Sequence, residues 1–131
     1  MNEHASAGLR IAMALYGDVT FDSRVQREAE VLSRAGHQVV VFCLSGDAAE
    51  APYEVVRWRP HRSAILPDGS SPFLRAGGSR NAAGISARVR WLFGYARNIR
   101  SWGQWAVRGA GRVDVWHVHD LTGLMAVAPF V

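Results

Sequence analysis

Residues 9–44, LRIAMALYGDVTFDSRVQREAEVLSRAGHQVVVFCL, determine the fold class that this sequence predicts. They begin and end with nearly continuous apolar runs, residues 9–16 and 38–44, which are typical of strands buried on both faces of a parallel sheet. The residues between these runs place an apolar stripe at helical spacing, formed by Val25, Ala29 and Leu32. The segment therefore predicts a strand–helix–strand unit, whose crossover connection is right-handed in nearly all known proteins.

Both ends of this helix carry recognisable signals. Asp22 and Ser23 offer capping side chains at its amino end, and Ser23 with Gln26 fits the S-x-x-Q capping box. Gly36 follows the apolar stripe and is expected to end the helix, since glycine tolerates left-handed backbone angles.

The composition suits one globular domain. The chain has 131 residues, of which 49% are hydrophobic and 20% charged, unlike a disordered segment. Its single cysteine, Cys43, excludes an internal disulfide, and the apolar run around it predicts a buried, inert thiol. No apolar stretch is long enough to span a bilayer, and residues 1–8 lack the pattern of a signal peptide, so we expect a cytoplasmic protein.

The charge of the chain is carried by an unusual set of side chains. All fifteen basic residues are arginine, and the formal net charge is +4. Arginine can grip phosphate with a planar fork, although codon usage in a GC-rich genome would produce the same composition. The charge predicts anionic partners without choosing among nucleotides, lipid headgroups and nucleic acids.

The remainder of the chain continues the alternation of strands and helices. Residues 53–58 and 113–119 are predicted strands, the first of them near an edge of the sheet. Residues 85–108 are a predicted helix, in which Gly94 and Gly103 are candidate break points. The stripe of this helix that we expect to face the sheet consists of Ile85, Val89, Leu92, Ala96 and Ile99.

Residues 60–84 are rich in Pro, Gly, Ser and Arg and are expected to form a long loop. Asp120 then opens a last helix, and the chain finishes at Val131. A complete doubly wound domain would continue with further β/α units, so we expect residues 1–131 to be one domain that is incomplete at its carboxyl end. The predicted fold class is α/β, with a Rossmann-like open parallel sheet and helices on both faces.

Two loops of this fold are the expected places for a ligand. In open parallel sheets, ligands bind at the carboxyl ends of the strands, which here lead into residues 17–24 and 117–122. The first strand is not followed by G-x-G-x-x-G, and the chain holds no P-loop motif. Both absences disfavour the common modes of dinucleotide and nucleotide binding.

Two stretches of the chain match known sequence motifs. Residues 22–41, DSRVQREAEVLSRAGHQVVV, are similar to the D-x-R-V-x-x-E-A-x-x-L-x-x-x-G-H-x-V-x-V pattern in the first helix and second strand of glycosyltransferase family 4. Residues 114–120, DVWHVHD, are similar to its D-V-x-H-x-H-[DE] strand end. Their order and separation fit the amino-terminal domain of a GT-B enzyme, and the resemblance covers most of the chain except residues 45–84.

The resemblance implies the acceptor-side domain of a retaining, nucleotide-sugar-dependent glycosyltransferase that needs neither a metal nor another cofactor. In such enzymes a second, carboxy-terminal Rossmann-like domain binds the nucleotide-sugar donor and carries an E-x7-E carboxylate pair. No two glutamates of this chain have that spacing, so the chain alone is expected to lack transferase activity. The implied partners are the donor, held by the missing domain, and a sugar or lipid-linked acceptor.

The resemblance makes His119 the expected catalytic residue, because the family's second histidine commonly lies near the acceptor and the transferred sugar. Its imidazole would orient a sugar hydroxyl; the alternative is a histidine that bonds to backbone at the strand end. His117 is expected to sit deeper, as a satisfied core histidine, and Glu28 to be structural. Both histidines with Asp120 are plausible metal ligands, but the spacing on a buried strand argues against a metal, and none is expected.

Five residues of the two loops are candidates for substrate binding: Gly17, Asp18, Asp22, Arg24 and Asp120. Asp22 and Arg24 fall where a loop meets a helix, whose free amide groups attract anions. Arg24 could add a bidentate grip on phosphate or carboxylate. The alternatives are that Asp22 caps the helix, that Arg24 is solvated or salt-bridged, and that Gly17 and Asp18 belong to a turn.

Residues 85–108 combine aromatic side chains with arginines, which suits a helix lying on an anionic membrane. The aromatic stripe consists of Trp91, Tyr95 and Trp102. Peripheral membrane contact, at the inner face, is one interpretation, and a core-facing helix with a solvated arginine face is the other.

Two further function classes stay open at this point. The chain could be a stand-alone α/β small-molecule-binding or regulatory module. An Arg/Trp-rich nucleic-acid-binding protein is the weaker alternative, because no nucleic-acid module motif supports it, and no nucleic-acid partner is expected.

Overall fold

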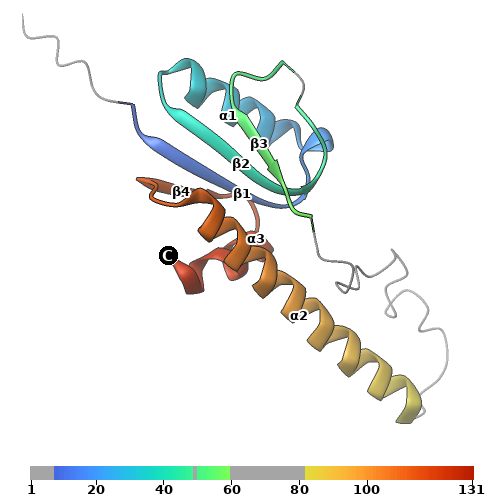
Figure 1. Ribbon diagram of the computed structural model, residues 1–131. Helices are drawn as coiled ribbons and strands as arrows, with labels where there is room; N and C mark the ends of the chain where they lie inside the picture. The colour runs from blue at the N-terminus through green and yellow to red at the C-terminus, as the bar shows by residue number, and fades with distance from the viewer. Residues whose placement is uncertain (1–7, 49, 60–81) are drawn as a thin grey trace, which may run out of the picture.

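A four-stranded parallel sheet forms the centre of the fold (Figure 1). The computed structural model describes residues 8–48, 50–59 and 82–131, with the backbone alone for 82–87. The strand order is β3-β2-β1-β4, and every pairing is parallel. The predicted Rossmann-like parallel sheet is confirmed.

Strand β1 (Arg10–Asp18) lies in the middle, between β2 (Gln38–Ser45) and β4 (Val115–Val118). Strand β3 (Glu54–Arg57) pairs with β2 at the edge, as expected for this segment. The register joins one residue of β1, Ile11, to Val39 of β2 and Val115 of β4.

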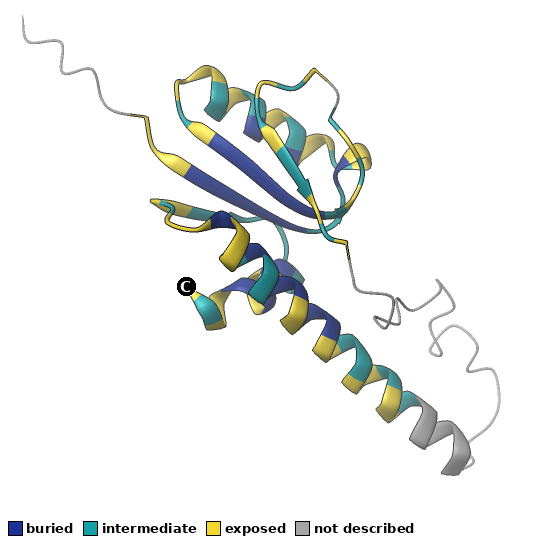
Figure 2. Ribbon diagram, viewed as in Figure 1, coloured by how far each residue is buried: buried dark blue, intermediate teal, exposed yellow. Residues whose placement is uncertain are grey.

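Helices cover both faces of the sheet, as predicted (Figure 2). Helix α1 (Ser23–Arg34) lies on one face. Helices α2 (Ala82–Ala110) and α3 (Leu121–Val127) lie on the other. Two short 3-10 helices complete the described elements, η1 (Val19–Phe21) after β1 and η2 (Ala128–Phe130) after α3.

Each face of the sheet has its own core. Successive residues of β1 contribute to the two cores in turn, because side chains of a strand point alternately to opposite faces. The odd positions Ile11, Met13 and Leu15 pack with buried Val25 and Ala29 of α1. The even positions pack on α2 and α3 in a second core, whose largest fully buried side chains are Trp102 and Phe42.

The amino-terminal cap of α1 differs from the predicted capping box. Asp22, not Ser23, is the cap, and its Oδ1 accepts hydrogen bonds from the amides of Arg24 and Val25 at 3.1 and 3.2 Å. Gln26 does not reach back to the cap; its side-chain amide donates to the Val19 and Thr20 carbonyls instead. The helix ends as expected, with Gly36 at a φ of 92°.

The second predicted helix is longer than the sequence pattern indicates. It begins at Ala82, so residues 82–84 are helical rather than part of the predicted loop, whose residues 60–81 lie outside the described part of the chain. It also runs without a break through Gly94 and Gly103. Tertiary packing in its carboxyl half therefore outweighs the cost of two helical glycines.

The expected apolar stripe of α2 was wrong for Val89, Leu92 and Ala96, which are exposed, whereas Ile99 is buried as expected. The side chain of Ile85 lies outside the described part of the chain. Val89 is 44% exposed and Leu92 49%, because the half of α2 that precedes Ile99 extends away from the sheet (Figure 2). The core is contacted by the second half, where Trp102 and Ala106 are fully buried. No described helix is long and apolar enough to cross a bilayer.

Cys43 is buried in β2, as predicted. Burial, helped by the charge of Asp18, raises the pKa of its thiol to about 11. The thiolate is the reactive form, so this cysteine is a weak nucleophile.

The contact between α2 and α3 predicts that replacing glycine by alanine has opposite effects on stability at two positions of α2. An added Cβ at Gly103 would collide with the backbone carbonyl of Ala126 in α3, whereas one at Gly94 would meet no other atom within 4 Å. We expect Gly103→Ala to destabilise the fold by about 1–3 kcal/mol and Gly94→Ala to stabilise it by up to about 1 kcal/mol. Urea unfolding measures both. A Gly103→Ala protein as stable as the unsubstituted chain would contradict the packing described here.

Candidate functional site

The carboxyl ends of β1 and β4 lie side by side at one edge of the sheet, here called the carboxyl rim. The backbone amide of His119 donates to the Ala14 carbonyl at 3.3 Å, which continues the β1–β4 pairing past the end of β4. Residues 17–24 leave β1 at the same rim and lead into α1. The two loops predicted to carry the ligand site therefore meet, as the strand order requires.

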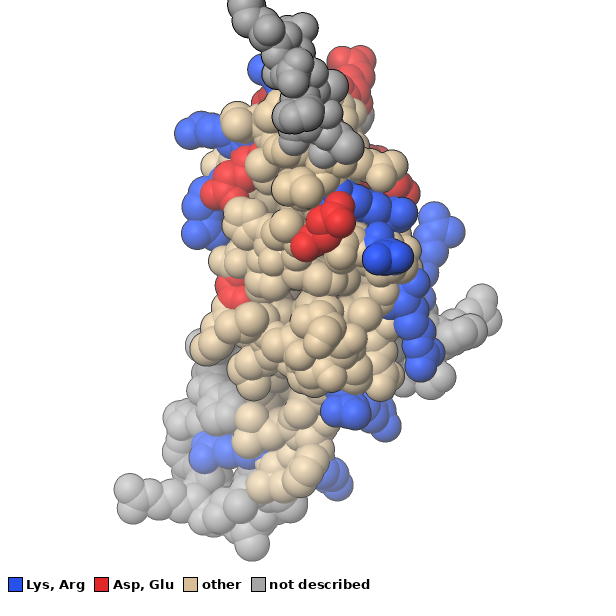
Figure 3. Space-filling view, turned by 90° about the vertical axis from the view of Figure 1, so that its left-hand side faces the viewer, with Lys and Arg blue, Asp and Glu red and all other residues tan. Residues whose placement is uncertain are grey.

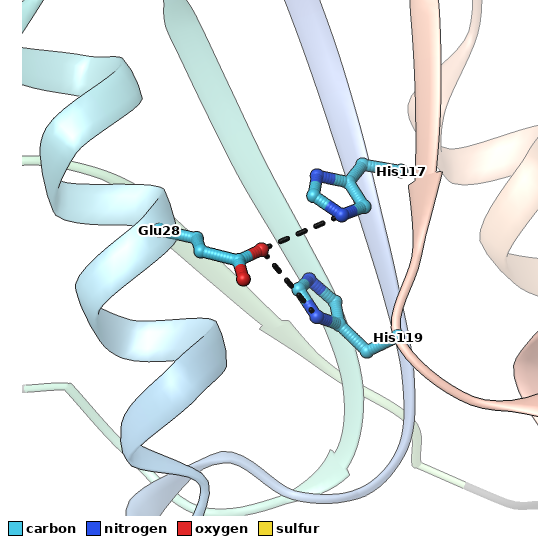
Figure 4. Close-up of side chains that lie close together, drawn as sticks. All are labelled: Glu28, His117 and His119. Carbon is cyan, nitrogen blue, oxygen red and sulfur yellow. Dashed lines mark ion pairs between the residues drawn. The ribbon is translucent and has the colours of Figure 1, made fainter.

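A triad of side chains joins α1 to the strand β4 at this rim (Figure 4). Oε2 of Glu28 lies 3.4 Å from Nε2 of His117 and 3.7 Å from Nδ1 of His119. The two imidazoles stack, with ring centroids 4.5 Å apart and planes 19° from parallel. Strand periodicity explains the stacking, because residues two apart point to the same face.

The depths of the two histidines are the reverse of the expectation. The His117 side chain is 42% exposed, whereas that of His119 is 5% exposed. His117 lies on β4, at an edge of the described sheet, where solvent reaches it. His119 follows the strand end and lies within electrostatic range of Asp22 and Arg24, which belong to the amino end of α1.

Burial controls the charge of His119. It lowers the pKa of the imidazole, and the neighbouring His117 lowers it further, while the carboxylates of Glu28 and Asp22 oppose the shift. The imidazole is therefore neutral at neutral pH, with one nitrogen free to accept a proton or a ligand. Its Nε2 is buried and has no hydrogen-bond partner among the described residues. Buried polar atoms are rarely left in this state, so Nε2 is a candidate contact for a ligand.

Asp22 and Arg24 adopt the structural arrangement that the sequence left as an alternative. Asp22 caps α1, and Nη2 of Arg24 lies 3.3 Å from its Oδ2. Burial would raise the pKa of Asp22, but the hydrogen bonds from Val25 and Arg24 lower it overall. The Arg24 side chain is still 72% exposed, so its remaining donors face solvent at the rim.

Asp18 also has structural partners. It accepts hydrogen bonds from the Ser45 hydroxyl and the Thr20 amide, each at 2.8 Å, and these bonds lower its pKa. An added Cβ at Gly17 would meet only the Leu15 side chain, so no close backbone approach among the described residues requires this glycine. Asp18 therefore holds the turn after β1, and Gly17 lies within that strand.

Gly46, which the sequence analysis did not single out, has a role in holding this turn. Its φ is 98°, and an added Cβ would collide with Asp18 and Thr20. A glycine directly after a buried strand is the signal that could have indicated it.

Asp120 is the amino-terminal cap of α3, and its Oδ1 accepts a hydrogen bond from the Gly123 amide. The five predicted substrate-binding residues thus lie at or beside the carboxyl rim. Three of them, Asp18, Asp22 and Asp120, use their carboxylates to cap helices or hold turns.

Glu28 is the site residue that the sequence analysis took to be structural. It lies one helical turn after Val25, a core residue of α1, and so borders the buried face of the helix. The sequence pattern could have indicated that border position. It could not indicate that this side of α1 faces β4, since that depends on how the helix crosses the sheet.

Comparisons with known proteins leave the family of the chain open. No family model matches it, and searches of curated proteins and of solved structures find no match. The functional argument therefore rests on the geometry of the rim and on the two sequence motifs.

Proposed function

We propose that this chain is the acceptor-side domain of a retaining glycosyltransferase that uses a nucleotide sugar, with the donor bound by a second domain outside these residues. The proposal is supported by the resemblance of residues 22–41 and 114–120 to glycosyltransferase family 4. The single observation that carries it is the contact of Glu28, from the first motif, with His119, from the second. Two motifs far apart in the sequence thus contribute to one site.

The chemistry of His119 suits the handling of an acceptor hydroxyl. Its imidazole is kept neutral by burial, so Nε2 can hydrogen-bond to a hydroxyl and orient it for transfer. The Glu28 carboxylate at 3.7 Å from Nδ1 would stabilise positive charge that develops on the ring. Because the side chain is 5% exposed, the proposal requires the atoms that enclose Nε2 to move apart when the acceptor binds.

Arg24 supplies the anion-binding part of the proposal. Its guanidinium is anchored by Asp22 on one side and open to solvent on the other, which suits a phosphate group attached to the acceptor. Asp18, Asp22 and Asp120 hold the two loops in place through their caps.

This proposal predicts that Arg24→Ala weakens binding of phosphorylated saccharides to the full chain. Hydrogen bonds to charged groups contribute about 1.5–3 kcal/mol, so the dissociation constant should rise roughly tenfold or more. An array of glycans and glycosyl phosphates identifies a ligand, and calorimetry measures its affinity. Arg34→Ala is the matched control, because this arginine is equally exposed, at 73%, but lies at the other end of α1.

Two results would contradict the proposal. A chain that binds no saccharide on the array, or one that loses affinity equally in Arg24→Ala and Arg34→Ala, does not use the carboxyl rim to hold an acceptor.

A contact with an anionic membrane is the second proposal, and it would suit a lipid-linked acceptor. It is supported by a hollow of about 770 Å³ between α2 and α3, lined mainly by apolar side chains. Phe93, which lines it, is 73% exposed, and Met125 is 61% exposed. Helix α2 carries five arginines and no acidic residue. Figure 3 shows a broad uncharged face, below which the only charged side chains visible among the described residues are basic.

The membrane proposal predicts that Phe93→Ser lowers co-sedimentation of the chain with vesicles that contain an anionic phospholipid. The substitution removes an exposed apolar side chain from the hollow, so it should not affect folding. Phe21→Ser is the matched control, since Phe21 is 86% exposed on η1, away from α2. Equal binding of both variants, or no binding of the unsubstituted chain at low salt, contradicts this contact.

A further inference from the structure

We propose that Glu28, His117 and His119 form a binding site for a divalent transition-metal ion, for which Zn²⁺ is the representative. The site shares Glu28 and His119 with the proposed handling of an acceptor. An ion on Nδ1 would leave the ring proton on Nε2, which could then donate a hydrogen bond to an acceptor hydroxyl. The ion would hold α1 against β4, the edge strand of the described sheet.

The geometry of the triad fits one ion. Its three ligand atoms lie within 4.8 Å of one another. Zn²⁺ binds nitrogen and carboxylate oxygen at about 2.0–2.2 Å, so a tetrahedral ion separates its ligand atoms by about 3.3–3.6 Å. Of the distances from Glu28 to the imidazole nitrogens, the 3.4 Å to His117 falls in this range and the 3.7 Å to His119 lies just above it. The two rings are stacked, so the half-exposed His117 ring would have to turn for both nitrogen lone pairs to point at one ion.

The donor set selects the class of metal. Two imidazoles and one carboxylate suit Zn²⁺ and other first-row divalent ions. Mg²⁺ and Ca²⁺ take oxygen ligands almost entirely, so two nitrogen donors disfavour them. The single cysteine, Cys43, belongs to the buried core on β2 and is not one of the triad.

The exposed fractions of the three side chains suit a site that an ion can enter from solvent. The His119 side chain is buried, at 5% exposure, while the Glu28 and His117 side chains are 47% and 42% exposed. Beside them is an open hollow of about 370 Å³, lined also by Arg27, Val31 and Leu32. The hollow leaves room for a water molecule as a fourth ligand.

The triad connects two elements that no backbone hydrogen bond joins. Glu28 lies on α1, and both histidines lie on or just after β4. An ion bound only in the folded state stabilises that state, so Zn²⁺ should raise the melting temperature of the chain.

The test uses the full chain without an affinity tag, stripped of metal by a chelator and dialysed. Calorimetry with Zn²⁺ should give a stoichiometry of one ion per chain, and Zn²⁺ but not Mg²⁺ should raise the melting temperature. Glu28→Gln and His117→Gln should each weaken Zn²⁺ binding by at least the roughly 10–100-fold that loss of an outer-shell partner costs, and should remove the thermal shift. These residues are half exposed, so the variants should fold, whereas His119 is buried and is left intact.

Two matched controls separate the site from other binding on the chain. Glu30→Gln makes the same change two residues along α1, on a carboxylate paired with Arg34. His37→Gln removes an imidazole that accepts a hydrogen bond from the Leu9 amide. Both should bind Zn²⁺ like the unsubstituted chain.

The spectrum of bound Co²⁺ tests the ligand identity. It should show d–d absorption without a thiolate charge-transfer band, since no cysteine belongs to the triad.

Three results would overturn the proposal: absence of Zn²⁺ binding, binding that Glu28→Gln and His117→Gln leave intact, or equal losses in the controls. The glycan and vesicle experiments do not involve the metal. Failure of the metal site is therefore distinguishable from failure of the proposed function.

Discussion

The pairing of β1 with both of its neighbours is the constraint on which the rest of the structure depends. Hydrogen bonds to β2 on one side and β4 on the other hold this strand in the middle of the sheet. There α1 on one face and α2 and α3 on the other bury its side chains in two cores. The same pairing aligns the end of β1 with the end of β4, down to the bond from the His119 amide to Ala14. Without it, Glu28 would not meet the two histidines.

Helix α1 completes the site by placing Glu28 next to the two histidines. Val25 and Ala29 anchor it to the sheet, and Glu28 then lies beside the end of β4. The triad combines the buried, neutral imidazole of His119 with the half-exposed side chains of Glu28 and His117. The two nitrogens of His119 have different proposed roles. Nδ1 contacts Glu28, where a metal ion would bind, and the unpartnered Nε2 is the atom that we assign to an acceptor hydroxyl.

The sequence predicted those features that depend on local pattern. Apolar runs gave the two central strands, and Asp120 marked the start of α3. Periodicity shows which residues share a helix face, but not where the sheet beneath them ends, so the exposure of Val89 and Leu92 was missed. The role of Glu28 was missed for a related reason: the crossing of α1 over the sheet is set by packing between distant segments. The depths of His117 and His119 depend on the same packing.

The juxtaposition of α1 with the end of β4 can be measured directly by nuclear Overhauser effects in the full chain, isotopically labelled and free of metal. The account predicts cross-peaks from the Glu28 side-chain protons to the ring protons of both His117 and His119, and between the two stacked rings. Cross-peaks that join the two histidines to each other but not to Glu28, or that are absent altogether, would contradict the site on which the acceptor and metal proposals rest.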